Sequence, residues 1–282
     1  MYEILKREDL NQNVVRMDIS APIVARKCLP GQFIILRVDE KGERIPLTVA
    51  GYDREKGIVT IIFQVVGKTT KLLSEKKQGE FLQDFVGPLG TASETTGYHK
   101  VAVIGGGLGC AIAYPQAKAI HENGAQVDII AGFRTKDLVI LEKEMKAAST
   151  NLYMVTDDGT YGEKGFVTNK LEELLKAGNE YDVVIAIGPL VMMKFVCQLT
   201  KKYHVKTIVS MNPIMIDGTG MCGGCRLTVD GKIKFACVDG PDFDGHQVDF
   251  DEAIRRSKMY ADQERQSMDE HCHLMQQAES SK

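Results

Sequence analysis

Short apolar or alternating stretches, separated by turn residues, fill the first part of the chain. They read YEILKR, NVVRMDIS, GQFIILRV, RIPLTVAGY and GIVTIIFQVV, and the turn stretches include LPG, DEKGE and DREKG. Short strands at even spacing, with turn signals between them, are typical of a barrel or a sandwich. We therefore predict a β-barrel domain over residues 1–97.

The pattern changes near Tyr98. KVAVIGGGLG is a continuous apolar run that ends in glycines, which is typical of a buried parallel strand leading into a helix. Beyond a helix over 109–122, the predicted strands are AQVDIIAGF, NLYMVTDD, YDVVIAIGP and, last, KTIVSM. The predicted helices between them are DLVILEKEMKAA, GFVTNKLEELLKAG and LVMMKFVCQLTKK. This alternation predicts an α/β domain with a doubly wound parallel sheet over residues 98–212.

The regular alternation stops at Met211. NPIMIDGTGMCGGC has the composition of a loop, and RLTVDGKIKFAC predicts a hairpin with a tight turn at Asp230-Gly231. We assign residues 213–246 to a small C-terminal module. Residues 247–282 form a polar tail that we expect to end in a helix.

Composition and charge narrow the functional class. The chain has 282 residues, 44% of them apolar, which allows two packed domains. Its net charge of −3 does not favour nucleic acid as a partner, because phosphate binding needs a concentrated basic face. No apolar run approaches the roughly 18–20 residues that span a bilayer, and the N-terminus lacks a signal-peptide pattern. We expect a cytoplasmic protein that uses neither membrane nor nucleic acid, with its seven cysteines reduced.

The glycine loop after the first strand of the second domain is the clearest ligand signal. Gly105, Gly106, Gly107 and Gly109 lie between a strand and a helix. Glycines there let the backbone approach a phosphate, and the helix N-terminus directs N–H groups at it. Cys110 stands where the G-x-G-x-x-G fingerprint has its last glycine. The pattern indicates a nucleotide site, and the alternative is a tight turn without a ligand.

The carboxyl ends of the strands that follow the glycine loop in the chain are expected at the same edge of the sheet. Ligands of such sheets bind at this edge. These strand ends carry Arg134, the Asp157-Asp158 pair and Gly188. Arg134 could hold an adenosine 2′-phosphate or a ribose edge, and the alternative is an ordinary surface arginine.

The barrel domain offers a second set of candidate residues. RIPLT places Arg44 four residues before Thr48. GKTT (67–70), which we interpret as a turn, and GPLG (87–90), a proline-glycine corner, follow. A guanidinium suits a pyrophosphate because its planar fork grips two oxygens. A hydroxyl on a strand suits a hydrogen bond to a ring nitrogen.

The order R-x-P-L-T, G-P-L-G and V-I-G-G-G-L-G resembles the ferredoxin-reductase family of FAD and NAD(P) enzymes. With a cysteine cluster after the nucleotide sheet, and with PGQF at 30–33, nearly the whole chain is similar to the electron-transfer subunits of dihydroorotate dehydrogenase. The resemblance implies FAD flanked by Arg44 and Thr48, which we take as the catalytic residues, with Pro46 and Leu47 against the ring. It implies that FAD ring and phosphates are lined by Val65, Val66, Gly67, Thr69 and Thr70. It also implies that NAD(H) is received by Gly105, Gly106, Gly107 and Gly109, with Arg134, Asp157, Asp158 and Gly188 near its other parts.

The stretch DGTGMCGGC carries a metal-site pattern. Plant-type [2Fe–2S] proteins use Cys-x4-Cys-x2-Cys and a distant fourth cysteine. Here the frame is Asp217-x4-Cys222-x2-Cys225-x11-Cys237. We predict a [2Fe–2S] cluster with Asp217 as its first ligand, a harder donor than sulfur that should alter the reduction potential. The surrounding glycines can turn amide N–H groups toward the sulfurs.

Three alternatives remain for this stretch. Asp217 could be an ordinary turn residue, with Cys197 or Cys272 as the fourth cluster ligand. The three clustered cysteines could hold a structural zinc ion together with His246. They could also include a free redox dithiol. His271 and His273 beside Cys272 are interpreted as incidental.

The aspartate also refines the family resemblance. Dihydroorotate-linked subunits carry cysteine at that position, whereas DGTGMCGGCR with FACVDGPDFDGHQVDF is similar to the small subunits of NADH-dependent reduced ferredoxin:NADP oxidoreductases. This resemblance implies an oxidoreductase subunit that exchanges hydride between NAD(H) and FAD. It implies electron relay through the cluster to a larger flavin and [4Fe–4S] subunit of an electron-bifurcating enzyme. The alternatives are a dihydroorotate dehydrogenase electron-transfer subunit and a non-enzymatic nucleotide-binding protein with structural zinc.

Overall fold

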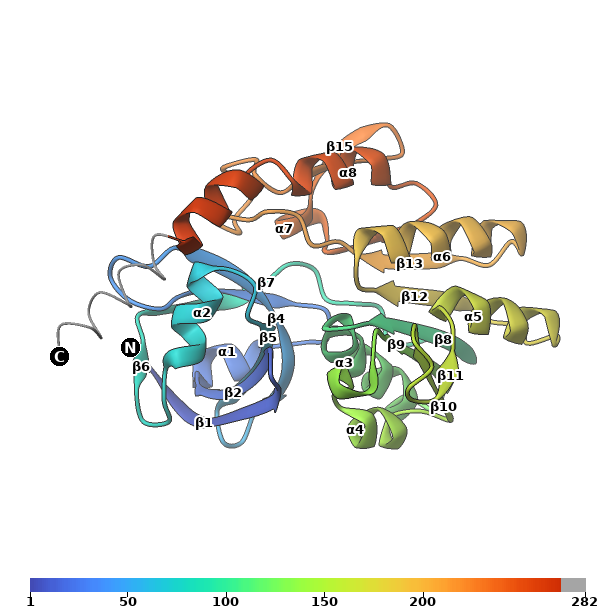
Figure 1. Ribbon diagram of the computed structural model, residues 1–282, viewed down its shortest axis with the longest axis horizontal. Coiled ribbons are helices and arrows are strands. Elements are labelled where there is room, and N and C mark those ends of the chain that lie inside the picture. The colour runs from blue at the N-terminus through green and yellow to red at the C-terminus, as the bar shows by residue number, and fades with distance from the viewer. Residues whose placement is uncertain (270–282) are drawn as a thin grey trace.

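The computed structural model describes residues 1–269 of the chain. Its first part is a near-closed antiparallel barrel with strand order β6-β1-β2-β5-β4-β3-β7 (Figure 1). The strands are β1 (Tyr2–Asn11), β2 (Val14–Ser20), β3 (Phe33–Arg37), β4 (Arg44–Asp53), β5 (Ile58–Gln64), β6 (Phe81–Leu82) and β7 (Asp84–Leu89). The predicted barrel is therefore confirmed. Alternate side chains of these strands fill its interior, as the period of two requires.

Two helices in this part carry no clear sequence signal, α1 (Pro22–Lys27) and α2 (Lys68–Glu75). The interpretation of GKTT as a turn was wrong, because its last three residues begin α2. The Thr70 hydroxyl accepts hydrogen bonds from the N–H groups of Val66 and Gly67 at 3.0 and 3.1 Å. A capping interaction of this kind needs only one polar side chain, so it leaves no periodic pattern.

The second part is the predicted doubly wound sheet, with order β11-β10-β9-β8-β12-β13-β16. Its strands are β8 (Lys100–Gly106), β9 (Gln126–Phe133), β10 (Asn151–Thr156), β11 (Glu163–Lys164), β12 (Val183–Ile187), β13 (Thr207–Ser210) and β16 (Asp242–Asp244). The helices are α3 (Gly109–Glu122), η1 (Lys136–Leu138), α4 (Glu142–Ala147), α5 (Val167–Lys176) and α6 (Leu190–Lys202). The side chains of α3 and α4 cover one face of the sheet, and those of α5 and α6 cover the other. Both faces are apolar because both are covered.

Two predictions for this sheet were wrong. The expected helix DLVILEKEMKAA is broken, because Ile140 and Leu141 turn into the core and Leu141 adopts a left-handed φ of 55°. The strand β13 is not the last one, since β16 pairs antiparallel with it. A strand of three residues with one apolar side chain is too short for a periodic signal.

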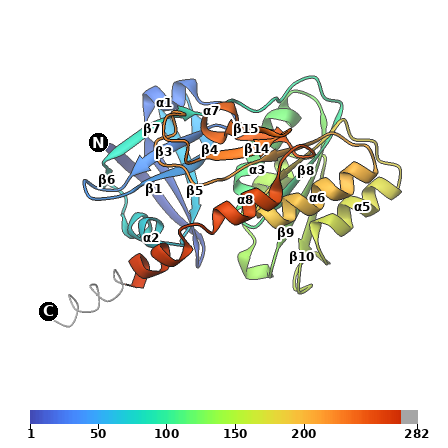
Figure 2. The same cartoon turned by 90° about the horizontal axis from the view of Figure 1, so that it is seen from above.

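The C-terminal part covers the sheet edge and the barrel. The predicted hairpin is confirmed as β14 (Arg226–Val229) and β15 (Lys232–Phe235), with positive φ at Asp230 and Gly231. It is followed by α7 (Ala236–Asp239), by α8 (Phe250–Ser257) and by helical residues 261–269. Figure 2 shows α8 alongside α6, and the Lys194–Asp251 ion pair of 2.7 Å joins these two helices. Within residues 1–269, no helix is both long and apolar enough to cross a membrane.

Candidate functional site

The predicted nucleotide-binding residues lie along one edge of the second sheet. Strands β10, β9, β8 and β12 are neighbours in that order, so their carboxyl ends form a continuous row. The row carries the Asp157-Asp158 turn, Arg134, the glycine loop and Gly188. From β8 the chain winds outward through β9 and β10, and later returns to β12 on the other side. The glycine loop therefore lies at the switch point of the sheet, where such folds bind ligands.

Packing explains why one position of the loop at 105–109 must be glycine. A Cβ atom on Gly109 would collide with the carbonyl oxygen of Ile187, and one on Gly106 would collide with the Met192 sulfur. Gly107 differs, because its φ is +55° and nothing lies within 4 Å of an added Cβ. Close approach of the backbone at Ile187 thus requires Gly109, whereas Gly106 meets the movable end of the Met192 side chain and Gly107 faces open space that a ligand can enter.

The Asp157-Asp158 turn lies directly beside Arg134. The Asp158 N–H donates to the Arg134 carbonyl oxygen at 3.3 Å. The Asp158 carboxylate accepts from the N–H and hydroxyl of Thr160 at 2.9 and 2.7 Å, which lowers its pKa. Asp158 therefore helps to shape its own turn, while the side chains of Asp157 and Arg134 are exposed.

The candidate flavin residues lie on two elements that meet at one end of the barrel. Residues Arg44 to Thr48 open strand β4. The Thr69 hydroxyl at the start of α2 donates to the Glu43 carboxylate at 3.2 Å. This bond joins the N-terminus of α2 to the residue that precedes Arg44. A guanidinium and the N-terminus of a helix are both suited to a pyrophosphate.

The cysteine loop, residues 217–225, contains an exposed Cys222 and a buried Cys225, and the third motif cysteine, Cys237, is buried in α7. Burial, chiefly, and the neighbouring Cys225 thiol raise the pKa of Cys237 to about 12. The Asp217 carboxylate accepts a 2.9 Å hydrogen bond from the Thr219 hydroxyl and a 3.1 Å hydrogen bond from the Cys222 N–H. Hydrogen bonds to Thr219 and Cys222 lower the pKa of Asp217, so it is an anion near neutral pH.

The donors of this loop fit an iron–sulfur cluster. The Gly224 N–H donates to the Cys222 Sγ at 3.5 Å, and the Gly220 N–H faces the Cys237 thiol. Amide N–H groups that face cysteine sulfurs are the interactions such clusters need. No three His, Cys, Asp or Glu side chains among residues 1–269 converge into a preformed metal site. The two Asp217 oxygens are bonded within the loop, so its role as fourth ligand stays a prediction.

The alternative ligands lie elsewhere or outside the described residues. His246 is engaged with α6, its Nε2 lying 3.0 Å from the Thr200 hydroxyl. Cys197 Sγ packs against Gly245 at the end of β16, and burial raises its pKa to about 12. Cys272, His271 and His273 lie outside residues 1–269. The structure therefore gives no support to a zinc site that includes His246.

The cysteine loop rests on the barrel. A Cβ added to Gly218 would lie 2.8 Å from Leu89 Cδ1 and 3.0 Å from Ile35 Cγ1. Ile35 on β3 is the cross-strand partner of Pro46 on β4. The predicted cluster loop thus contacts β3, the strand that pairs with the predicted flavin strand β4. The sequence contained no signal for Ile35 beyond its apolar character, and Leu89 was noted only as part of the GPLG stretch.

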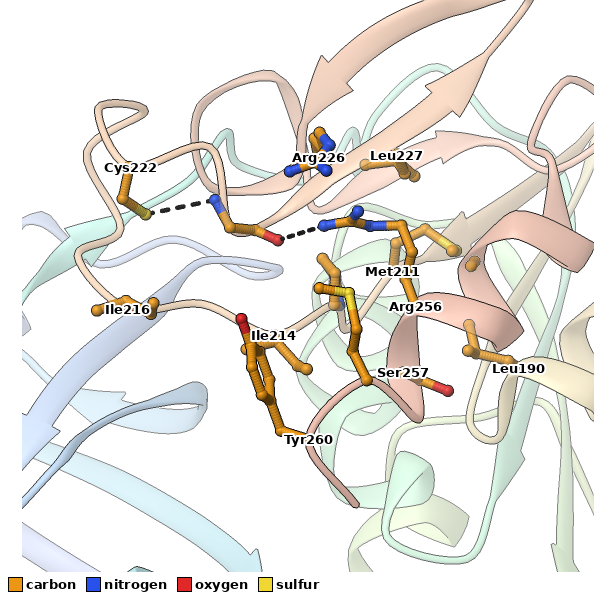
Figure 3. Close-up of a pocket in the computed structure, with 14 residues that line it drawn as sticks. Leu190, Met211, Ile214, Ile216, Cys222, Arg226, Leu227, Arg256, Ser257 and Tyr260 are labelled. Atoms are coloured by element: carbon orange, nitrogen blue, oxygen red, sulfur yellow. Dashed lines mark hydrogen bonds between the residues drawn. The ribbon is translucent and has the colours of Figure 1, made fainter. Parts of the chain in front are cut away.

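Two arginines that were not among the candidates from the sequence also reach this loop. A cavity of about 200 Å³ lies beside it, and its lining includes Arg226, Arg256 and Tyr260. Figure 3 shows these side chains around the pocket. Arg226 donates to the Gly223 carbonyl at 3.4 Å, and Arg256 to the Gly224 carbonyl at 3.2 Å. Arg226 directly follows Cys225 in the chain, but the position of Arg256 is set only by folding.

Comparison with known proteins identifies the family. Residues 212–249 match the iron–sulfur cluster binding domain of dihydroorotate dehydrogenase B, and residues 103–198 match the oxidoreductase NAD-binding domain. A relative from Thermotoga maritima, the dihydroorotate dehydrogenase B (NAD(+)) electron transfer subunit homolog, is 47% identical over 94% of this chain and 93% of its own. The chain belongs to the dihydroorotate dehydrogenase B electron-transfer subunit family.

The chain is also similar to two further proteins over nearly its whole length. An uncharacterized Clostridium beijerinckii protein is 53% identical over 94% of this chain and 92% of its own. A chain of the NADH-dependent reduced ferredoxin-NADP oxidoreductase, studied for flavin-based electron bifurcation, has a TM-score of 0.92 and 44% identity. That match covers 96% of this chain and 98% of the other. The family resemblance expected from the barrel, glycine-loop and cysteine motifs is confirmed.

Proposed function

We propose that this chain is an electron-transfer flavoprotein subunit that connects NAD(H) to a larger redox partner. The observation that carries the proposal is the contact of Gly218 with Ile35, whose cross-strand partner is Pro46. It brings the cysteine loop to the strand next to the predicted flavin residues. Bound FAD would supply hydride exchange with a nicotinamide, and a bound [2Fe–2S] cluster would supply one-electron transfer.

The residues of the chain would bind and orient these groups. Arg44 and the N-terminus of α2 would hold the FAD pyrophosphate, and the Thr48 hydroxyl would bond a ring nitrogen. Gly107 and the row of strand ends would receive NAD(H). Cys222, Cys225 and Cys237, with Asp217, would hold the cluster.

We infer that the surface around the cysteine loop binds a partner. Ile216, Met221 and Val238 are 54%, 86% and 46% exposed, although all three are apolar. Exposed apolar side chains gathered at one site are typical of protein interfaces. We infer a larger flavin and [4Fe–4S] subunit as the partner, since the chain resembles a subunit of a bifurcating oxidoreductase. The expected cytoplasmic location stays a prediction.

The test is purification under anaerobic conditions, followed by a visible spectrum and counts of flavin, iron and sulfide. We expect a yellow-brown protein with one FAD and a two-iron, two-sulfide cluster per chain. The chain alone should oxidise NADH with artificial acceptors but should not couple ferredoxin to NADP. A colourless protein with one tetrahedral metal ion would favour the structural-zinc alternative. Coupled turnover by the lone chain would contradict the subunit assignment.

The same spectrum identifies the fourth ligand. Asp217→Cys should retain the cluster with a changed spectrum, Asp217→Ala should lose much of it, and Cys272→Ala should leave it unchanged. Loss of the cluster in Cys272→Ala but not in Asp217→Ala would show that Asp217 is a turn residue. The large subunit that co-purifies separates the bifurcating enzyme from dihydroorotate dehydrogenase.

A further inference from the structure

The Gly223-Gly224 pair between two cysteines is held from outside by two guanidinium groups. Arg226 Nη1 lies 3.4 Å from the Gly223 carbonyl oxygen, and Arg256 Nη2 lies 3.2 Å from the Gly224 carbonyl oxygen. On the opposite side, the Gly224 N–H donates to Cys222 Sγ. Figure 3 shows the two contacts of Gly224, one to sulfur and one to Arg256.

Peptide geometry links the contacts on the two sides. In a trans peptide the C=O and N–H groups point in opposite directions. A guanidinium on the Gly223 carbonyl therefore favours the orientation in which the Gly224 N–H points to the Cys222 sulfur. Arg256 restrains the next peptide, between Gly224 and Cys225. It binds the Gly224 carbonyl, so the Cys225 N–H points away from the Arg256 guanidinium.

Arg256 comes from an element outside the loop, 32 residues from Gly224. Its helix α8 is fixed against the hairpin, since the Glu252 carboxylate accepts from the Thr228 N–H at 3.1 Å. Glu252 and Arg256 are four residues apart, so they lie on one face of the helix. The helix is anchored in the position that brings the guanidinium to the loop.

We propose that Arg256 is a positioning residue for the iron–sulfur cluster, an inference that rests on the function proposed above. Its guanidinium holds the Gly224 carbonyl and so restrains the residue whose N–H donates to the Cys222 sulfur. It also adds a positive charge beside the cysteine sulfurs. Both effects favour the reduced form of a cluster, because hydrogen bonds to the sulfurs and nearby charge set its potential.

The test compares Arg256→Gln with Arg255→Gln in the anaerobically purified chain. Arg255 is the exposed neighbour in the same last turn of α8, so the control removes the same charge from the same helix end. We expect Arg256→Gln to lower the midpoint potential of the cluster. We also expect the cluster to be lost to a chelator on the order of 10-fold faster. Arg256→Lys keeps the positive charge but lacks the planar guanidinium. Its rate of cluster loss should therefore lie between those of Arg256→Gln and Arg255→Gln.

The outcomes separate the two proposals. If Arg256→Gln matches Arg255→Gln in potential and rate of cluster loss, the inference is wrong and the proposed function stands. An unmodified chain without iron and sulfide overturns both. If Arg256→Gln is recovered without FAD, Arg256→Lys is compared with the unmodified chain instead. Faster loss of the cluster in Arg256→Lys supports positioning by Arg256, and an equal rate of loss refutes it.

Discussion

The nucleotide edge and the cysteine loop are both rich in glycine, yet different parts of the structure hold them in place. At the edge, the predicted binding residues follow neighbouring parallel strands, and Gly109 packs against the backbone at Ile187. The cysteine loop has little regular structure, rests on the barrel at Gly218 and is reached by Arg256 from α8. Sheet topology therefore positions the first site, whereas contacts between separate units position the second. Damage to the first should unfold a domain, and damage to the second should release a cofactor.

The largest effect is expected from Gly109→Ala. The new Cβ would strike the Ile187 carbonyl, and neither backbone can move without disturbing β12 or α3. We expect the free energy of unfolding to fall by about 3 kcal/mol or more, measured by urea denaturation. The matched control is Gly107→Ala, where an added Cβ meets open space and only the positive φ costs about 1–2 kcal/mol. Equal stability of the two variants would mean that packing does not require Gly109.

A smaller and more local effect is expected from Gly218→Ala. The substitution strains a φ of +77° and pushes the loop away from Leu89 and Ile35. We expect iron content to fall and the cluster to be lost several-fold faster, while FAD content and global stability change by less than in Gly109→Ala. Gly231→Ala is the control, because its φ is +68° and nothing lies within 4 Å of its added Cβ. Should the control lose the cluster equally, backbone strain and not the barrel contact would be responsible.

The smallest effect is expected where β16 of the C-terminal part joins the nucleotide sheet. Burial raises the pKa of Asp242, despite hydrogen bonds from Ser93, Ser210 and Gln116. Its Oδ1 and the Gln116 Oε1 are buried without a hydrogen-bond partner. An asparagine amide could donate to Gln116 and carries no charge. At pH 8 we therefore expect Asp242→Asn to increase the free energy of unfolding by about 1 kcal/mol.

The pH dependence of that gain follows from the direction of the pKa shift. A carboxyl whose pKa is higher in the folded chain takes up a proton on folding, so the unmodified chain gains stability as the pH falls through the folded pKa. The advantage of Asp242→Asn should shrink between pH 8 and pH 5 in urea unfolding at constant salt. A constant difference across this range would show that the charge of Asp242 plays no part.

Much of the fold was predictable because it rests on local patterns. The run ending at Gly105 indicated a buried strand, and the Asp230-Gly231 dipeptide indicated the hairpin turn, since both signals lie within a few residues. The start of α2 at Lys68 and the break at Leu141 were missed. In the first case a single hydroxyl caps the helix, and in the second burial of Leu141 overrides an apparent helical period.

The candidate sites divide in the same way. The spacing from Asp217 to Cys237 and the glycine loop could be found in the sequence, because each is a property of one short segment and its chemistry. Only the tertiary structure decided that the cysteine loop packs against Ile35 and that Arg256 donates a hydrogen bond to the Gly224 carbonyl. Those contacts join residues far apart in the chain and depend on how the packed units meet, which no local periodicity records.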